Sequence, residues 1–462
     1  WDKIDVYYKD VLYRCDGHGF AGIMRPDLLM ILATRCEELG VELNFETTID
    51  DPSNYAEDAD LLIGADGLKS TVREHYADQL KPNVVEGDAK FAWYGTEHPL
   101  DVFTFIFREN EHGLWQIHAY PGPYCTFLVE STEETWLNAG LDEASIDESL
   151  AYFEDLFSDH LGGYELLSNQ SIWRNFPKVT NQNWSYDNVV LLGDAAHTVN
   201  YSIGSGTKMA MEDAISLMEA FDKHGTDRSA ALSHYELDRR PITSVLQKAS
   251  DRSQRYFENV ARYLHMDPYQ FTFHHLTRSG RISYDNLRSR DRSFVDRYDN
   301  WFTETFHPDN NQNSNLAVAS PPMFVPYQLD SLRLQNRVVL REDPTDQASE
   351  GCPSPEQLDE IVERGTNGVG MVLTQRVAVS PTGRTTPGTP GLYHDDHVDT
   401  WADSVDKIHE RSEAKVGIHL FHAGRRGATR TRRYGLDRPL PSSKAWPLVS
   451  ASAIPYHERS PD

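Results

Sequence analysis

Residues 188–197 read Asn-Val-Val-Leu-Leu-Gly-Asp-Ala-Ala-His, and residues 202–214 read Ser-Ile-Gly-Ser-Gly-Thr-Lys-Met-Ala-Met-Glu-Asp-Ala. The apolar run is typical of a strand buried in a parallel sheet, and the second stretch of a glycine-rich loop that opens a helix through Phe221. Small residues after Asp194 allow close backbone approach, and Gly204 and Gly206 leave amide groups free at the helix start. Because a helix N-terminus carries partial positive charge, the pattern favours a negatively charged group there.

A second motif of this kind lies upstream. Residues 60–66 read Asp-Leu-Leu-Ile-Gly-Ala-Asp, a short apolar strand, and Gly67-Leu-Lys-Ser-Thr-Val-Arg73 follows it. Taken alone, Asp-Gly after a strand is usually a turn. Before it, apolar residues at helical spacing predict a helix over 25–40, and alternation predicts a strand over 41–47. Helix, strand and buried strand in succession indicate an α/β fold.

The rest of the chain divides by pattern into further segments. We expect an antiparallel sheet over about 84–175, helices over about 227–306, a linker at 307–322 and a second domain over 323–462. In this second domain, strands at 369–375 and 415–421 flank a helix at 401–409. The first domain is therefore predicted to span 1–306.

Composition excludes several classes of protein. The 462 residues include 44 Lys and Arg against 71 Asp and Glu, for a net charge of −27, which disfavours nucleic acid and anionic membranes as partners. No apolar run approaches the roughly 18 residues of a membrane span, so we expect a cytoplasmic protein. The four cysteines form no C-x-x-C pair, which argues against a disulfide framework or a metal site. A high-salt cytoplasm and an ordinary acidic enzyme both fit the charge.

Together, in this order and with a β-rich insert between them, the two motifs resemble the flavoprotein aromatic hydroxylases built like para-hydroxybenzoate hydroxylase. The resemblance implies that FAD is bound through its ribityl chain by Asp194, which follows Gly193. It implies that Gly204, Ser205 and Gly206 meet the pyrimidine edge of the flavin. Reduced flavin carries negative charge on that edge, which a helix N-terminus would stabilise.

The same resemblance assigns roles to the upstream motif. Asp66, Gly67 and Arg73 would belong to a second fingerprint, on the FAD pyrophosphate side and near the nicotinamide donor, NAD(P)H. Arg25 stands where the family has a flavin-contacting arginine. The family's G-x-G-x-x-G fingerprint is absent upstream, which we interpret as a chain that lacks its N-terminal βαβ unit.

The glycine-rich loop is closer to one branch of this family. Ser202 replaces a proline, and Ser-Ile-Gly-Ser-Gly-Thr-Lys208 looks like the salicylyl-CoA 5-hydroxylase and 2-aminobenzoyl-CoA monooxygenase/reductase branch. The stretch from Arg278 to Asp291 is also similar; a solvated surface explains most of its arginines, and a few are candidates for the phosphates of coenzyme A. A lone histidine such as His197 is more often structural than catalytic, and we assign no catalytic residue.

Three segments of the second domain resemble the Old Yellow Enzyme family of flavin reductases on a TIM barrel. They begin at Met323, at Val379 and at Gly417, the last reading Gly-Ile-His-Leu-Phe-His-Ala-Gly-Arg425. The resemblance makes His419, His422 and Arg425 candidates for an FMN site. About 140 residues cannot close a barrel of about 250, so a partial barrel is expected. Residues 341–344, Arg-Glu-Asp-Pro, replace Ser-Pro-Met, and His419 replaces a glutamine, at positions where the family contacts FMN.

The order of the two domains matches that of the aryl-CoA branch. We therefore expect an FAD- and NAD(P)H-dependent monooxygenase that uses O2 to hydroxylate an aromatic CoA thioester, fused to a barrel that binds FMN. A homodimer is a further expectation, and no metal is. Two alternatives stay open: a flavoprotein reductase or dehydrogenase that does not use oxygen, and a barrel that serves as a non-catalytic module.

Overall fold

The apolar run at 188–193 forms the central strand of a three-stranded sheet. The computed structural model describes residues 1–168, 171–307, 319–435 and 437–456. In it, the run forms β12 (Val189–Leu191), which is fully buried. It pairs in parallel with β3 (Leu62–Gly64) and antiparallel with β11 (Ser185–Tyr186). The chain divides into two compact units, Trp1–Val295 (unit 1) and Asp296–Asp462 (unit 2).

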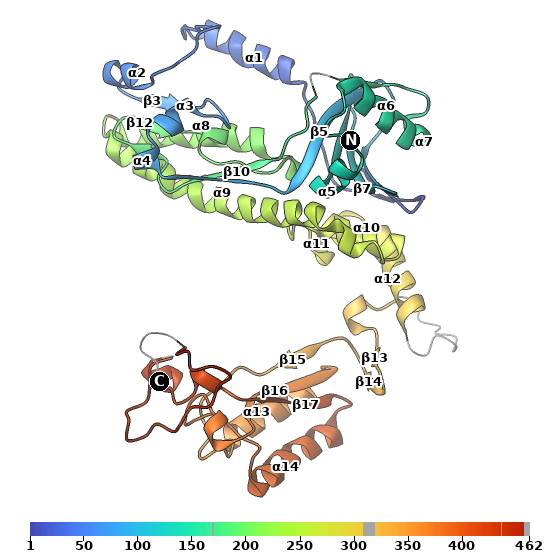
Figure 1. Cartoon of the computed structure of the whole chain (residues 1–462), viewed down its shortest axis with the longest axis vertical. Helices are drawn as coiled ribbons and strands as arrows, with labels where there is room; N and C mark the ends of the chain where they lie inside the picture. The colour runs from blue at the N-terminus through green and yellow to red at the C-terminus, as the bar shows by residue number, and fades with distance from the viewer. Residues whose placement is uncertain (169–170, 308–318, 436, 457–462) are drawn as a thin grey trace. The chain divides into compact units, whose positions relative to one another are not determined.

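Two long helices pack against this small sheet, as Figure 1 shows. They are α8 (Gly206–His224) and α9 (Arg228–Glu258). Their inner faces join β12 in one apolar core through residues such as Leu217 and Tyr235. Burial of this kind contributes about 25 cal/mol for each Å² of apolar surface removed from water. A two-stranded antiparallel ribbon, β4 (Pro82–Glu86) with β10 (Pro177–Asn181), completes this part of unit 1.

A seven-stranded sheet forms the other half of unit 1, in the order β2-β1-β6-β7-β8-β5-β9. Its strands are β1 (Ile4–Tyr8), β2 (Val11–Cys15), β5 (Ala89–Thr96), β6 (Phe103–Asn110), β7 (Gly113–Tyr120), β8 (Cys125–Thr132) and β9 (Leu166–Ser168). All neighbours are antiparallel except β1 and β6. The antiparallel sheet predicted at 84–175 is therefore present, and a hairpin at residues 4–15, which the sequence pattern did not predict, extends it.

The remaining helices of unit 1 are shorter. They are α1 (Arg25–Glu38), α2 (Ser53–Asp58), α3 (Thr71–His75), α4 (Ala77–Leu80), α5 (Glu133–Asn138), α6 (Ile146–Leu156), α7 (Ser158–Leu161), α10 (Pro268–Thr277) and α11 (Tyr284–Arg290). Helix α12 (Arg292–Phe306) crosses the division between the units. The helices predicted at 25–40 and 227–306 are confirmed.

Two local predictions for the first domain are wrong. Residues 41–47 form no strand, because alternation produces a strand only where a neighbour supplies backbone partners, and none pairs with them in the described chain. Phe45 is 72% exposed there. Strand β3 is an outer strand rather than a buried one, and its Ile63 is 42% exposed. The predicted linker at 307–322 falls largely on 308–318, outside the described residues, so the domain boundaries stay predictions.

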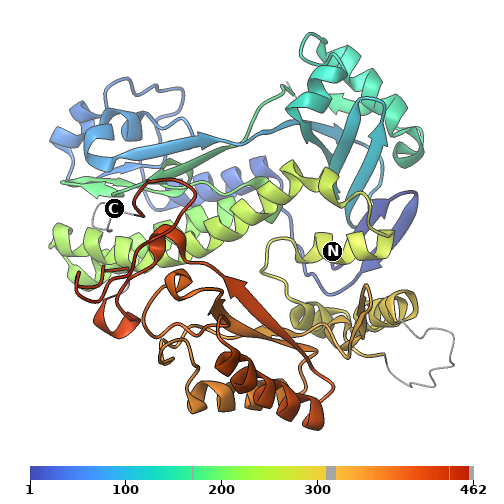
Figure 2. The same cartoon turned by 60° about the horizontal axis from the view of Figure 1, so that its bottom comes forward.

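Unit 2 contains a parallel three-stranded sheet in the order β15-β16-β17. Its elements are β15 (Val339–Arg341), α13 (Pro355–Thr366), β16 (Met371–Ala378), α14 (Asp395–Arg411) and β17 (Lys415–Phe421), preceded by the hairpin β13 (Tyr327–Leu329) and β14 (Leu332–Leu334). Helices α13 and α14 cover one face of the sheet (Figure 2) and form its core through Ile361, Trp401 and Ile408. The β/α alternation predicted for this region is confirmed.

Candidate functional site

The two sequence motifs meet at one edge of the small sheet. Since β3 and β12 are parallel neighbours, with Leu191 opposite Gly64, their carboxyl ends release both motifs on the same side. Arg73 joins them: its buried guanidinium donates to Leu68 O at 2.5 Å and to Ala195 O at 3.0 Å. Desolvation lowers the pKa of Arg73, and the negative charge of Asp66 offsets part of this decrease.

Asp66 organises the turn that follows β3. Its carboxylate accepts hydrogen bonds from Ser70 Oγ at 2.5 Å and from Val72 N at 3.1 Å, at the start of α3. Gly67 has a φ of +79°, and no atom of the described chain lies within 4 Å of the place that a Cβ would occupy, so its backbone stays open to a ligand. The polar groups of Asp66 and Arg73 already have protein partners, and their contact with a cofactor stays a prediction.

Asp194 lies exposed at the end of β12, in the short 3₁₀ turn η1 (Gly193–Ala195). Desolvation by the atoms around it raises the pKa of its carboxyl, and the charges of His197 and Arg25 oppose that rise. Arg25, the first residue of α1, is thus near enough to act electrostatically on Asp194. Beyond this electrostatic influence, the contact of Arg25 and Asp194 with a cofactor stays a prediction.

His197 belongs to a buried network that fixes this turn. Its Nε2 lies 2.7 Å from Asp213 Oδ2, and the same oxygen accepts from Gly193 N at 3.1 Å. The other oxygen of Asp213 accepts from Arg239 Nε at 2.8 Å. His197, Asp213 and Arg239 are all at most 5% exposed, and this geometry supports the structural role for His197. Asp213 stands within the quoted motif, but nothing in the local pattern pointed to its partners.

The loop between Asn200 and Gly206 carries the other predicted residues. Gly204 takes a φ of +57° at the end of η2 (Tyr201–Ile203), and among the residues that the structure describes nothing lies within 4 Å of the position of a Cβ there. Helix α8 begins at Gly206, and no side chain of the described residues caps it, although Ser205 stands at its N-cap. Its first amide groups are therefore available to a ligand.

Ser202 anchors this loop to the helices behind it. Its hydroxyl lies 2.8 Å from Ser253 Oγ on α9, and its carbonyl accepts from Arg278 at 3.2 Å. Arg278 also donates to Ser253 Oγ at 3.1 Å, and its guanidinium packs over the rings of Phe105 and Phe257. Burial lowers the pKa of Arg278 to about 10. Arg278 is therefore a support of the loop rather than part of a solvated surface, which the sequence did not reveal.

A buried acid–base pair lies on the seven-stranded sheet beside the same loop. His118 Nε2 on β7 is 2.9 Å from Glu130 Oε2 on β8, and both side chains are at most 3% exposed. The ring of Tyr201, the first residue of η2, meets that of His118 edge-on with the centroids 5.6 Å apart. Burial raises the pKa of Tyr201 well above the usual value, and the charge of Glu130 adds to the rise. This group joins the sheet to the loop, and sequence reasoning missed it because its members lie far apart in the chain.

The residues at this edge fit FAD. A carboxylate suits the hydroxyls of a ribityl chain, and uncapped amides at a helix start suit the negative edge of a reduced flavin. The open space at Gly204 and Gly206, where a Cβ would meet at most one atom at 3.9 Å, leaves room for that approach. Asp194, Arg25 and the 204–206 backbone would hold the group.

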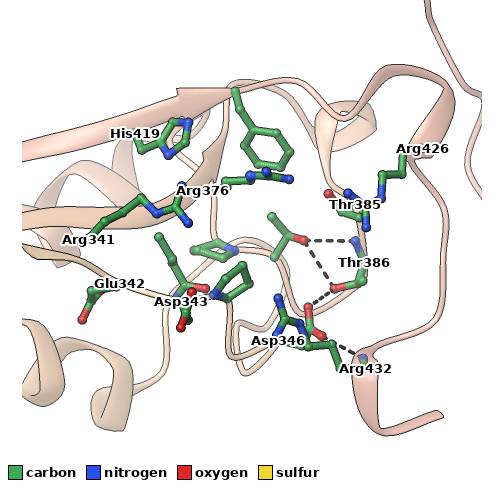
Figure 3. Close-up of a pocket in the computed structure, with 15 residues that line it drawn as sticks. Arg341, Glu342, Asp343, Asp346, Arg376, Thr385, Thr386, His419, Arg426 and Arg432 are labelled. Carbon is green, nitrogen blue, oxygen red and sulfur yellow. Dashed lines mark hydrogen bonds between the residues drawn. The ribbon is translucent and has the colours of Figure 1, made fainter. Parts of the chain in front are cut away.

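A second site lies in unit 2, at the carboxyl ends of β15, β16 and β17. A cavity of about 160 Å³ is bordered there by polar side chains (Figure 3). Its lining residues are Arg341, Glu342, Asp343, Pro344, Asp346, Gln375, Arg376, Thr385, Thr386, Thr389, Pro390, His419, Phe421, Arg426 and Arg432. The pairing of β16 with β17 shifts register between Leu373 and Arg376, and Gln375 and Arg376 at this irregularity line the cavity.

Of the three residues predicted for an FMN site, only His419 lines this cavity. His422 accepts a hydrogen bond on Nδ1 from Gly424 N at 3.0 Å, and Arg425 is exposed and donates to Ile454 O. Arg426, the neighbour of Arg425, lines the cavity instead. The donors around the cavity fit one polar or anionic portion of FMN, because a space of about 150 Å³ holds about one benzene ring.

Burial also changes the acid at this site. Glu342 is 5% exposed, and desolvation raises its pKa to about 7 despite the opposing charge of Arg364.

In the described part of the chain, no group of three or more His, Cys, Asp or Glu side chains could hold a metal ion. Among the same residues, no helix has both the length and the apolar character needed to cross a bilayer.

Comparisons with known proteins match two successive parts of the chain to two families. Residues 44–250 match an FAD binding domain family, and residues 322–442 match the NADH:flavin oxidoreductase / NADH oxidase family. These matches define a flavin-dependent oxidoreductase with an FAD-binding α/β domain followed by a domain of a TIM-barrel family. FAD and FMN are the cofactors of the two families.

Curated relatives narrow the class. A salicyloyl-CoA 5-hydroxylase from a Streptomyces species is 35% identical over 367 residues, covering 77% of this chain and 68% of the relative. A 3-hydroxy-4-methyl-anthranilyl-[aryl-carrier protein] 5-monooxygenase from Streptosporangium sibiricum is 34% identical, covering 62% and 76%. The chain belongs to the FAD-dependent aromatic monooxygenases. In unit 2, a 12-oxophytodienoate reductase 7 from Oryza sativa subsp. japonica is 37% identical over 107 residues, 22% of this chain and 26% of that protein.

Proposed function

We propose that the chain is an FAD- and NAD(P)H-dependent hydroxylase of an aromatic CoA thioester, such as salicylyl-CoA or 2-aminobenzoyl-CoA. The observation that carries the proposal is the packing of the turn before Asp194 against α8, where a Cβ on Gly193 would lie 2.9 Å from the Cβ of Ala210, one turn from the uncapped start of that helix. The aryl-CoA relative adds support, because its match covers 77% of the 462 residues, more than the 295 residues of unit 1 contain. The shared region therefore extends into unit 2.

The residues of unit 1 would act by binding and orientation. The Asp194 carboxylate would accept a hydrogen bond from a ribityl hydroxyl, and the first amides of α8 would stabilise negative charge on the reduced ring. Bound FAD supplies the two-electron chemistry that places one oxygen atom of O2 on the aromatic ring and releases the other as water, at the expense of NAD(P)H. The seven-stranded sheet, with the buried His118–Glu130 pair, would exclude water from the substrate side.

The test compares substrates of the FAD-loaded enzyme. We expect salicylyl-CoA, and not free salicylate or CoA, to stimulate NADH or NADPH oxidation and to gain one oxygen atom by mass spectrometry, with ¹⁸O incorporated from ¹⁸O2. Asp194→Ala should lose this activity together with bound FAD. Reduced nicotinamide consumption that yields only hydrogen peroxide with every aryl-CoA tried would refute the proposal. Turnover without oxygen uptake would instead favour the reductase alternative.

Unit 2 belongs to a reductase family, and its activity in this chain is a separate part of the proposal. We infer that it binds FMN and takes part in reduction. Counting flavins per chain tests this inference, because two flavins support a working domain and one supports a non-catalytic module. A homodimer also stays a proposal, which light scattering of the purified enzyme would check.

A further inference from the structure

A cavity in unit 1, which we call the arginine cavity, is bordered by four arginines. It has a volume of about 420 Å³ and is lined by the last turns of α9, the turn η3 (Val260–Tyr263) and the end of α10. Its arginines are Arg252 and Arg255 on α9, Arg262 in η3 and Arg278 directly after α10. No Asp or Glu is among its lining residues in the described chain. In a protein with a net charge of −27, this concentration of positive charge is a local exception.

Three of these guanidinium groups have no partner in the described part of the chain. Arg252, Arg255 and Arg262 are exposed, and among the described residues their side chains form no ion pair and donate no hydrogen bond. Arg252 and Arg255 stand three residues apart, on one face of α9, where like charges repel each other. An anionic ligand would relieve this repulsion and would meet donors that are not already occupied.

The acids of the same helical turns are held by other groups. Asp251 accepts a hydrogen bond from Lys178 Nζ at 2.6 Å, and Glu258 accepts one from Asp88 N at 3.0 Å. Neither acid lines the arginine cavity. The charge of the exposed arginines is therefore available to a ligand rather than neutralised by a neighbouring carboxylate.

Three rings lie among the arginines. Tyr256 and Tyr263 stack with their centroids 5.6 Å apart, and the ring of His274 lies 4.3 Å from that of Tyr263. The hydroxyl of Tyr256, whose side chain is 6% exposed, has no hydrogen-bond partner among the described residues, and Nδ1 of His274 has none either. Because buried polar groups in native proteins are nearly always satisfied, these two groups point to a polar occupant of the cavity that both residues line.

The arginine cavity is separate from the segments that match the two flavin families. Those segments are residues 44–250 and 322–442, and every lining residue of the cavity falls between them. Arg278 connects the cavity to the loop of the proposed flavin site, because its guanidinium also donates to Ser202 O at 3.2 Å. Of the stretch from Arg278 to Asp291, in which the sequence suggested contacts to coenzyme A, only Arg278 lines the cavity within the described ranges.

We propose that the arginine cavity binds the phosphorylated adenosine end of a nucleotide coenzyme, with Arg252, Arg255 and Arg262 on its phosphates. The planar fork of a guanidinium matches the oxygens of a phosphate, and a partly exposed aromatic ring such as Tyr263 offers a surface on which a base stacks. A volume of about 420 Å³ lies within the range of small-molecule sites.

Two coenzymes of the proposed function carry this chemistry. Coenzyme A has a phosphate on the 3′ position of its adenosine ribose, and NADPH has one on the 2′ position, whereas FAD has neither. The matched compounds without the ribose phosphate are dephospho-CoA and NADH. Only the choice of these two coenzymes rests on the proposed function; the positive charge of the cavity does not.

The experiment is isothermal titration of the FAD-saturated full chain at physiological ionic strength, with CoA and dephospho-CoA and with NADP⁺ and NAD⁺. The oxidised nicotinamides bind without turnover. We expect one phosphorylated coenzyme to bind at least about fivefold more tightly than its matched compound, which identifies the ligand. The variant Arg252→Gln/Arg255→Gln should bind it about tenfold more weakly, because each exposed charge contact contributes about a factor of three. Arg262→Gln, a change in a different element, should weaken binding about threefold.

Arg281→Gln is the matched control. Arg281 is exposed and belongs to the neighbouring arginine-rich stretch, but it does not line the cavity, so this variant should bind within about twofold of the wild type. Equal binding of the two members of both pairs by the wild type would overturn the proposal. So would unchanged binding by the double variant, or a loss in Arg281→Gln as large as that in the double variant. Circular dichroism checks that each variant is folded.

The titration also separates this inference from the proposed hydroxylation. Binding of CoA that depends on Arg252 and Arg255, in an enzyme that hydroxylates no aryl-CoA, would leave the cavity assigned and refute the proposed function. Hydroxylation of salicylyl-CoA with the same KM in the wild type and the double variant, and with no effect of the double variant on NADP⁺ binding, would support the proposed function and overturn the assignment of the cavity.

Discussion

The buried network around Asp213 predicts a large and specific loss of stability when a single heavy atom is replaced. Asp213→Asn keeps the shape of the side chain and removes its charge. In the wild type, one carboxylate oxygen accepts from Arg239 Nε and the other from Gly193 N, with His197 Nε2 at 2.7 Å. An amide offers one acceptor oxygen, so its NH2 group must face one of these donors.

The size of the effect follows from burial. Breaking a buried ion pair by removal of one partner costs about 3–5 kcal/mol, because the remaining charge is left without compensation. Arg239 keeps a second partner, Glu212 Oε2 at 3.2 Å, so we expect the lower end, about 3 kcal/mol. Unit 1 spans Trp1–Val295, and unfolding entropy of about 2.1 cal/mol/K per residue converts this loss to a fall of about 5 °C in its melting temperature.

Differential scanning calorimetry measures this shift, and FAD fluorescence titration measures the accompanying loss of cofactor affinity, because the network holds the Gly193–Asp194 turn. Asp238→Asn is the matched control: this carboxylate lies on the same helix as Arg239, is exposed, and accepts only from Ser216 Oγ at 2.8 Å among the described contacts. The control should change stability by less than about 0.5 kcal/mol. A melting temperature of Asp213→Asn that matches the control would refute the reasoning.

Three further predictions concern other supports of the sites. Arg278→Met should weaken FAD binding about tenfold in a folded protein, because the hydrogen bond to Ser202 O that holds the loop is lost. Fluorescence titration with FAD measures this change, and an unchanged affinity would show that the loop does not depend on Arg278. Burial raises the pKa of Glu342 from 4.5 to about 7, so between these pH values the folded state holds a proton that the unfolded chain has lost. The free energy of unfolding should therefore fall by about 3 kcal/mol as the pH rises through this range. Urea unfolding at pH 5 and pH 8 should show this fall in the wild type and not in Glu342→Gln. Gly193 has a φ of +56°, and a Cβ there would lie 2.9 Å from the Cβ of Ala210, so Gly193→Ala should lower the free energy of unfolding by about 3 kcal/mol. Gly204 has a similar φ but open space around it, so Gly204→Ala should lower it by about 1 kcal/mol. Equal losses for the two variants in denaturant unfolding would contradict the packing argument.

Patterns confined to neighbouring residues were sufficient to predict much of the fold. The apolar run at 188–193 and the glycine-rich loop after it identified β12 and α8, because both strand burial and helix initiation depend on adjacent residues. The strand predicted from the alternation at 41–47 is wrong, because strand formation depends on a pairing partner that the local sequence does not reveal. The same limit hid the hairpin at residues 4–15 from the prediction of the sheet.

The site divides in the same way. Asp194 and the 204–206 loop were found because they are contiguous with a recognisable motif. Arg278, 76 residues beyond Ser202, could not be placed, because only the tertiary fold brings it there. In unit 2 the motif led to Arg425, and the structure places its neighbour Arg426 at the cavity, since a one-residue difference in a turn changes the direction of a side chain.

The guanidinium of Arg73 donates hydrogen bonds to carbonyls in two loops, Leu68 O and Ala195 O, the second 122 residues further along the chain. The two loops are therefore held together and should move together. A ligand that immobilises the turn at Asp194 should also slow amide hydrogen exchange near Leu68, with no contact of its own there. Substitutions that alter the length of either loop would have to be matched in the other, so the two segments are constrained to change together during evolution.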